Sequence, residues 1–459
     1  MDSFFCRMAS GVVLASALTF NAAIPETIES FHQEGPLPTK AAVLAQLQNV
    51  LKDEFSLWYP RTEDTVYGGY FTDLNYRWDL AGPQTKMIVT QARLVWSASH
   101  GKEYYADKTL LRKAAGHGFR FLRDVMWDKQ DGGFYDLVTR EGEVIKEHGE
   151  IVKRAYGNAF AIYGLAAYYK AWGDTAALHL AQAAFRWLDQ HSWDPVDGGY
   201  FQFLSRDGKP FTEGYDHTPP KDQNSSIHLL EALTELYHVW PDPLVRERLS
   251  TMLHLIRDRM VTDKGYLQLF FKKDWTPISF RDASGAERER NYELDHVSFG
   301  HDIETGYLLL EASSALGLKN DTTTQRIAKK MVDHSLLYGW DKEHGGLFDG
   351  GYYFAGKTEP AIVKNTKEWW AQLEALNSCL MMAQKYPNDP MHYEHYFLKQ
   401  WKYCDQYLLD HEYGGWYWGG IDIVPANTKA AKASIWKVNY HTSRAIINCI
   451  VRLTGRSAK

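Results

Sequence analysis

Cysteine is scarce in this chain, and charge of one sign never accumulates. Four cysteines occur in 459 residues, namely Cys6, Cys379, Cys404 and Cys449. Cys6 lies in the N-terminal apolar stretch, which leaves an odd three, so a disulfide framework is excluded. The net charge is -6 and no long basic stripe is present. We therefore expect no nucleic-acid partner and no anionic-membrane partner.

Long hydrophobic runs are also absent. The longest candidate, Met8 to Phe20, follows Arg7 and precedes Asn21-Ala22-Ala23. It is shorter than the roughly 20 residues that a membrane span needs. A short apolar run between a positive and a small-residue segment is typical of a secretory signal peptide. We predict a signal peptide over residues 1–23, a mature chain over 24–459, export to the periplasm or the outside, and no membrane association after cleavage.

Nucleotide-binding signatures are missing too. No glycine-rich phosphate loop and no dinucleotide fingerprint occurs, and the run from Gly414 to Tyr417 follows no parallel-strand pattern. Aromatic residues, in contrast, are abundant, with 16 Trp and 28 Tyr. Such side chains stack on sugar rings, but large helical proteins also bury them in the core. Composition leaves these two interpretations equally open.

A glycine and aromatic motif recurs six times, for example as Asp131-Gly132-Gly133-Phe134-Tyr135. The first glycines of the six copies are Gly68, Gly132, Gly198, Gly265, Gly345 and Gly414. Their spacings of 64, 66, 67, 80 and 69 residues define an internal repeat. The length alone would suggest about three domains. The repeat favours a single domain over residues 24–459.

Each repeat predicts two amphipathic helices, one before the glycines and a smaller, more aromatic one after them. The first helices are expected near 40–59, 105–127, 175–192, 243–260, 321–339 and 391–410. The second are expected near 86–100, 155–172, 224–239, 300–316, 366–385 and 435–454. Six such pairs close most simply into a ring. The sequence predicts an all-α fold, a single (α/α)6 barrel whose second helices line the inside, with short β-hairpins covering one end.

Polar residues gather near the starts of the predicted inner helices. They are Arg93, Tyr156, Asn224, His228, His301, Glu304, Trp369, Trp370, Glu374, Trp436, Tyr440, His441 and Arg444, with Asp216 in a proline-rich loop. Buried charges are costly unless paired, so we expect these groups to surround one polar ligand pocket. A salt-bridge network that only ties the helices together is the alternative for Glu374 and Arg444.

His301 and Glu304 stand three residues apart at a predicted helix start. The positive end of a helix disfavours imidazolium, so His301 is expected to be neutral near pH 7 and able to accept a proton. Metal binding is a weaker interpretation, because zinc and di-iron sites use more compact spacings than these isolated histidines show. We predict no metal and no cofactor.

The chain resembles the N-acylglucosamine 2-epimerase superfamily, and within it the cellobiose 2-epimerases, over essentially the whole mature sequence. The motifs that carry the resemblance are Asn224-Ser225-Ser226-Ile227-His228-Leu229-Leu230-Glu231-Ala232, Ser298-Phe299-Gly300-His301-Asp302-Ile303-Glu304, Glu368-Trp369-Trp370-Ala371-Gln372-Leu373-Glu374-Ala375 and Trp436-Lys437-Val438-Asn439-Tyr440-His441. The resemblance implies that His301 and His441 are the two acid/base residues at the sugar C2. It also implies that His228 assists ring opening and Arg93 holds the developing oxyanion.

By the same resemblance Trp370 and Trp436 would stack on sugar units. Further pocket positions of the family are matched by Tyr156, Asp216, Asn224 and Glu304. Two departures are Asn439, where the family usually has proline, and Thr442-Ser443, which replaces an Asn-containing continuation. These departures concern the identity of the sugar. The resemblance implies a small carbohydrate substrate. We expect the protein to be a monomer or a weak homodimer.

Inverting C2 of a sugar requires ring opening, removal of the C2 proton to give an enediolate, and return of a proton to the other face. Two positioned acid/base groups and one oxyanion donor perform these steps without a metal. Rival hypotheses are a mannose 2-epimerase, an aldose–ketose isomerase, a glycoside hydrolase using Glu304 and Glu374, and a carbohydrate-binding protein without turnover.

Overall fold

The computed structural model describes residues 36–455, all but the first of them in one compact unit that begins at Leu37. The predicted signal peptide lies outside the described residues, and that expectation stays a prediction. The outer helices are α1 (Lys40–Trp58), α3 (Lys108–Phe121), α5 (Thr175–Ser192), α7 (Pro243–Leu255), α10 (Thr322–Tyr338) and α12 (Tyr393–Tyr407). The inner helices are α2 (Ile88–His100), α4 (Ala155–Trp172), α6 (Gln223–Val239), α9 (Phe299–Ala315), α11 (Trp369–Lys385) and α13 (Tyr440–Thr454).

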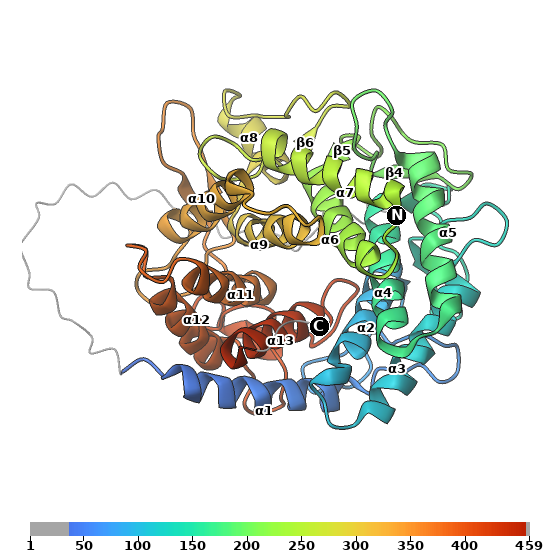
Figure 1. The fold of residues 1–459 in the computed structure, drawn as a ribbon, viewed down its shortest axis with the longest axis horizontal. Helices are drawn as coiled ribbons and strands as arrows, with labels where there is room; N and C mark the ends of the chain where they lie inside the picture. The colour runs from blue at the N-terminus through green and yellow to red at the C-terminus, as the bar shows by residue number, and fades with distance from the viewer. Residues whose placement is uncertain (1–35, 456–459) are drawn as a thin grey trace, which may run out of the picture. The chain divides into compact units, whose positions relative to one another are not determined.

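The inner helices form a closed ring. Each packs on the next in chain order, and α13 packs back on α2. Each outer helix covers an inner one, with α1 lying on α13 (Figure 1). The predicted (α/α)6 barrel is confirmed, and most predicted helix bounds agree within two or three residues. No described helix is both long and apolar enough to cross a membrane.

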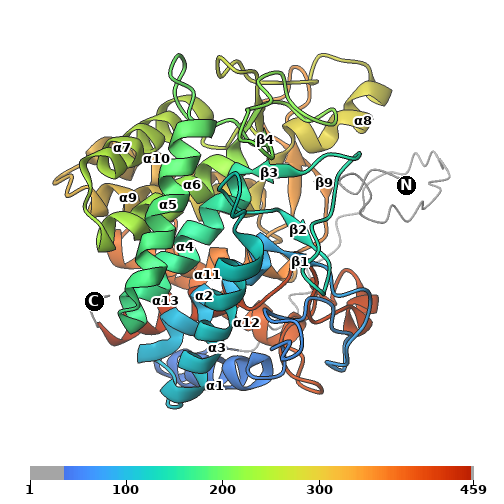
Figure 2. The same cartoon turned by 90° about the vertical axis from the view of Figure 1, so that its right-hand side faces the viewer.

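Short strands gather at one end of the helices together with the additional helix α8 (Gly285–Asp295) (Figure 2). They are β1 (Lys86–Met87), β2 (Leu137–Val138), β3 (Val152–Arg154), β4 (Phe203–Ser205), β5 (Lys221–Asp222), β6 (Phe270–Phe271), β7 (Val297–Ser298), β8 (Gly350–Tyr352) and β9 (Ala361–Lys364). The strands do more than form local hairpins. The strand before an inner helix pairs antiparallel with a strand of the following repeat, as β1 does with β2 and β3 with β4.

An ion pair recurs beneath this end of the barrel. In five of the six repeats, a buried aspartate four residues before the first glycine binds a buried lysine in the segment that leads to the inner helix. The pairs are Asp64–Lys86, Asp128–Lys153, Asp194–Lys221, Asp341–Lys367 and Asp410–Lys432, at 2.5 to 3.0 Å. In the first four of these pairs the lysine stands two residues before an inner helix, so the pair joins a glycine loop to the start of that helix and fixes where its first turn lies. Lys432 lies further from α13, in the loop that leads to it.

The fourth repeat replaces both partners together. Thr262 occupies the aspartate position, since its amide donates to Tyr266 as the aspartate amides donate to the second glycine. Val297 occupies the lysine position, two residues before α9, and is fully buried. The chain thus avoids leaving one buried charge alone, which costs more than losing the pair.

We predict that Lys221→Met lowers the free energy of unfolding by about 3–5 kcal/mol, because it leaves the buried Asp194 carboxylate unpaired. Asp194→Thr combined with Lys221→Val copies the fourth repeat and should cost less than the single change. Urea unfolding at neutral pH measures both variants. A double variant less stable than Lys221→Met would contradict the pairing argument.

The same ion pairs predict how stability depends on pH. Burial alone would raise the pKa of Asp64, but hydrogen bonds from Arg140 and Lys86 outweigh it and bring that pKa to about 2. The pKa of Asp194 is likewise lowered, because the Lys221 bond outweighs burial. Unfolded aspartate has a pKa near 3.9, so this stabilisation is complete above about pH 4 and is lost as pH falls toward 2. Urea midpoints between pH 2 and 7 test this, and constant midpoints below pH 4 would contradict it.

Candidate functional site

The first two turns of the inner helices carry the polar residues that the sequence singled out. Tyr156, Asn224, Trp370 and His441 each occupy the second position of their helix, and His301 occupies the third position of α9. One turn further in lie Arg93, His228, Glu304, Glu374 and Arg444. The deeper group is buried, whereas Tyr156, Asn224, His301 and Trp370 are partly exposed. Solvent therefore reaches the site from the end that carries the strands.

Arg444 lies at the centre of the deeper layer. Its Nη1 donates to Glu231, and its Nη2 donates to both Glu304 and Glu374, the last at 2.6 Å. These three carboxylates come from α6, α9 and α11, so one guanidinium on α13 connects four inner helices. Burial would lower the pKa of Arg444, but the charges of Glu231 and Glu374 outweigh it and raise that pKa well above its usual value. The side chain stays a cation.

His441 is oriented by Glu374. Its Nδ1 lies 2.6 Å from Glu374 Oε1, the same oxygen that accepts from Arg444 Nη2. A guanidinium only donates, so this oxygen is an acceptor and the proton of the contact resides on Nδ1. Tyr307 donates to the other oxygen of Glu374 at 2.6 Å. The Nε2 of His441 is therefore left as a free lone pair.

His228 is held in the same way by Glu231. The Nδ1 of His228 lies 3.0 Å from Glu231 Oε2. Burial would raise the pKa of Glu231, but Arg444 and then His228 hold it well below its usual range. Glu231 is thus an anion that accepts the Nδ1 proton. This glutamate follows His228 by three residues on one helix face, a spacing that sequence reasoning used for His301 and Glu304 but did not apply here.

His301 has neutral partners. Its Nδ1 lies 2.9 Å from Ser298 Oγ and 3.4 Å from Gln223 Nε2. Burial lowers the pKa of His301 well below 6.5, and positive charge on the neighbouring rings of His228, His296 or His441 would act in the same direction. Burial also lowers the pKa of His441, with Arg93 the next cause. The two imidazoles are therefore neutral near pH 7. The sequence predicted a neutral His301 from its place at a helix start, whereas the main cause in the structure is burial.

The Arg93 side chain reaches from the deeper group to the first turn of α4. Its Nη2 donates to Tyr156 Oη at 3.0 Å, and its guanidinium lies over the Phe160 ring at 4.2 Å. Several buried polar atoms of the described site have no protein partner, among them Arg93 Nε, Arg444 Nε, Asn224 Oδ1 and Glu304 Oε2. These four atoms comprise two donors and two acceptors. Such a set suits the hydroxyl groups of a sugar, each of which both donates and accepts.

One group of described residues could hold a metal ion. The ligand atoms of Glu304, Glu374 and His441 lie within 4.8 Å of one another. Arg444, however, already donates hydrogen bonds to both carboxylates. A divalent ion there would lie against a guanidinium, so the donor set does not fit a metal. That the protein needs no metal stays a prediction.

Two predicted aromatic residues lie elsewhere than expected. Trp369 is 3% exposed and packs on Trp418 with ring centroids 4.9 Å apart, because neighbouring helix positions point in different directions and Trp370 takes the inward one. Trp436 was predicted on the last inner helix, but α13 begins at Tyr440 and Trp436 lies partly buried in the preceding loop. The loop holds it through the Ser434 hydroxyl, which accepts from its amide at 3.1 Å.

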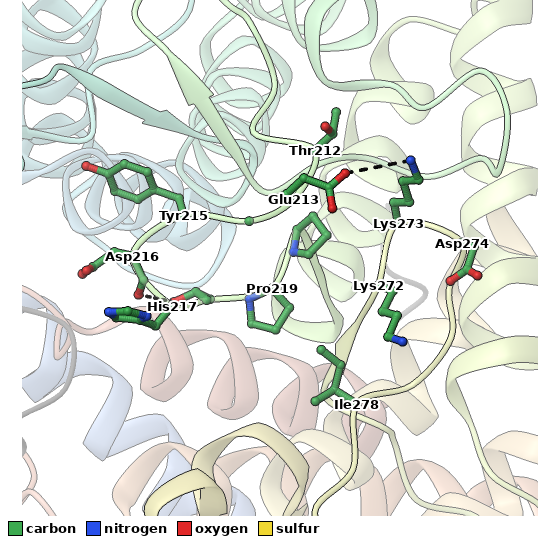
Figure 3. A pocket seen from close by; sticks show the side chains of 13 residues that line it. Thr212, Glu213, Tyr215, Asp216, His217, Pro219, Lys272, Lys273, Asp274 and Ile278 are labelled. Carbon is green, nitrogen blue, oxygen red and sulfur yellow. Dashed lines mark hydrogen bonds and ion pairs between the residues drawn. The ribbon is translucent and has the colours of Figure 1, made fainter.

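Asp216 lies in the loop between β4 and β5. Its carboxylate is 3.4 Å from His148 Nε2, and its backbone is left-handed at φ 46°. Asp216 lines an open cavity of 670 Å³ between the loops around Tyr215 and Lys273 (Figure 3). A second cavity, of 720 Å³, lies beside α3. None of the inner polar residues lines either cavity.

Comparisons with known proteins agree with this geometry. The family model for N-acylglucosamine 2-epimerase (GlcNAc 2-epimerase) matches residues 69–445. A cellobiose 2-epimerase from Bacteroides fragilis is 27% identical over 86% of this chain and 94% of its own length. A mouse N-acylglucosamine 2-epimerase is 24% identical over 88% of this chain and 90% of its own length.

The fold comparison gives the same result. The structure of a cellobiose 2-epimerase from Spirochaeta thermophila superposes with a TM-score of 0.77 at 26% identity, covering 91% of this chain and 98% of that one. The family model spans most of the described barrel, including the segments that carry His228, His301 and His441. The chain therefore belongs to the N-acylglucosamine 2-epimerase family, whose named members are carbohydrate isomerases.

Proposed function

We propose that the protein is a sugar 2-epimerase that interconverts the C2 configuration of the reducing-end glucose or mannose unit of β-1,4-linked disaccharides such as cellobiose and mannobiose. The observation that carries this proposal is the pair His301 and His441. They come from different helices, and their rings lie against the same indole, that of Trp370, at 4.7 and 5.8 Å. Relatives named cellobiose 2-epimerase support the disaccharide.

The proposed chemistry follows from the protonation of these groups. One neutral imidazole takes the C2 proton of the opened sugar and leaves an enediolate. The other imidazole, having taken up a proton from solvent, delivers it to the opposite face of C2, and the first then releases its proton to solvent. The roles exchange in the reverse direction. Arg93 stabilises the enediolate oxygen, and His228 transfers a proton during ring opening. A buried donor in place before the reaction is commonly worth about 10²- to 10³-fold in rate.

Glu374 supports this scheme at His441. When His441 takes the C2 proton it becomes an imidazolium, and the carboxylate that faces its Nδ1 at 2.6 Å stabilises that charge. The proton thus enters at Nε2 while Nδ1 stays bonded. This is the arrangement expected of a general base whose second nitrogen is held by a carboxylate.

The hydrolase alternative fits less well. A glycosidase needs two carboxyl groups across the scissile bond, about 5 to 9.5 Å apart. The nearest oxygens of Glu304 and Glu374 lie within 4.8 Å and share Arg444 as a donor. A carboxylate that accepts from Arg444 is not free to act on a glycosidic bond, and the three histidines would have no role in hydrolysis. A monosaccharide 2-epimerase or an aldose–ketose isomerase uses the same enediolate and is the second candidate.

We predict that the purified protein in D2O converts cellobiose into its C2 epimer with deuterium at C2, as proton NMR would show. Mannobiose and mannose are tested in parallel and identify the preferred sugar. A ketose product would indicate an aldose–ketose isomerase, and free monosaccharides would indicate hydrolysis. Binding without any product would leave only a carbohydrate-binding protein.

His301→Asn and His441→Asn should each lower kcat by about 10²- to 10⁴-fold, because each removes one of the two acid/base groups. His254→Asn, at an exposed position on α7, is the matched control and should keep full activity. Loss of activity in all three variants would indicate a general effect on folding and would contradict the assignment.

A further inference from the structure

Trp370 forms part of the wall on which both proposed acid/base residues rest. Its ring lies 4.7 Å from the His301 ring and 5.8 Å from the His441 ring, measured between centroids. These histidines lie on α9 and α13, and Trp370 lies between them in chain order on α11. The angle and depth of this indole therefore affect the position of both imidazoles at once.

The indole also lies directly on the backbone of α9. A Cβ atom at Gly300 would lie 2.7 Å from Trp370 Cη2 and 2.9 Å from Cζ3, so a side chain does not fit there. Gly300 immediately precedes His301. The benzene end of the indole is thus fixed by packing, and its remaining freedom concerns the pyrrole end, where the Nε1 hydrogen lies.

Glu368 holds that pyrrole end. Trp370 Nε1 donates to Glu368 Oε2 at 2.8 Å. Glu368 is the residue directly before α11, and its own amide donates to Asp349 Oδ1 at 2.8 Å. Asp349 is fixed in turn by Thr366, whose hydroxyl donates to Oδ2 at 2.6 Å. A chain of hydrogen bonds therefore runs from the strand segment before β8 to the indole.

The two carboxyl groups in this chain lie close to each other. Burial raises the pKa of Asp349 to about 7, and the charge of Glu368 acts in the same direction. Lys364 of β9 opposes the shift, while Tyr292 of α8 and Tyr403 of α12 also face Asp349. Two buried carboxyl groups close together repel each other when both are charged, unless each accepts hydrogen bonds that stabilise it. Here each accepts a hydrogen bond that fixes the start of α11.

We propose that Glu368 is a positioning residue of this site: its carboxylate holds the Trp370 indole so that His301 and His441 keep the spacing that proton transfer at one carbon requires. The proposal rests on the proposed epimerase function for its kinetic consequence. Its structural part, an indole fixed by Glu368 against two imidazoles, is independent of the substrate.

The test compares three variants. Glu368→Met removes the acceptor at nearly constant volume and should lower kcat by about 10- to 100-fold with a smaller change in KM, because misplacing a reacting group by about 1 Å costs that much. Glu368→Gln keeps an acceptor oxygen and should recover activity to within about fivefold of the unmodified protein. Glu359→Met, exposed between β8 and β9, is the control and should be unchanged.

A second readout needs no turnover. In ¹⁵N-labelled protein, the Trp370 indole N–H resonance and the His301 and His441 imidazole resonances should all shift in Glu368→Met and return toward their original positions in Glu368→Gln. An inactive unmodified protein with these NMR shifts would refute the proposed function but support the positioning role. Unchanged imidazole resonances in a folded Glu368→Met, or a kcat equal to that of Glu359→Met, would overturn the inference.

Discussion

One buried cation determines how the site is built. Arg444 binds carboxylates from three other inner helices, and two of those carboxylates orient a histidine each. Three negative charges around one positive charge would be unfavourable alone. Tyr307 and Tyr440 donate to two of the carboxylates and spread the excess charge. Removing Arg444 would leave buried carboxylates uncompensated, which couples helix packing to the chemistry of the imidazoles.

The repeat supplies the frame in which this cation works. Four of the aspartate and lysine pairs fix a glycine loop to the start of an inner helix, and the fifth fixes the loop before α13, so these helices begin at the same end of the ring. Residues in the first turn of these helices then lie at the open end of the site, and residues one turn deeper contact one another. The fourth repeat departs from this rule, with Thr262 and Val297 in place of the pair, and it is the repeat that carries His301.

Much of the fold and part of the site could be predicted from sequence. Glycine spacing and helical periodicity gave the barrel and its inner helices, and the polar residues near the helix starts do come together, from Arg93 to Arg444. The helix α8 was missed because its sequence, rich in Glu and Arg, has no apolar face, although the spacing of 80 residues marked an insertion. The positions of Trp369 and Trp436 could not be predicted. The direction in which a helix side chain points and the residue at which a loop ends both depend on tertiary packing. Asp216 lies in a loop and has a left-handed backbone, which no sequence pattern indicates.

The most direct test of the role of Arg444 is the tautomer of His441 at pH 7.5, read from its ¹⁵N imidazole shifts in the unmodified protein and in Arg444→Met. With Arg444 present, Glu374 is an acceptor, so we expect a neutral His441 ring with its proton on Nδ1 and a free Nε2. In Arg444→Met the ring should lose this single form. A proton on Nε2 in the unmodified protein, or an unchanged tautomer in the variant, would contradict the claim that Arg444 sets the protonation of the site.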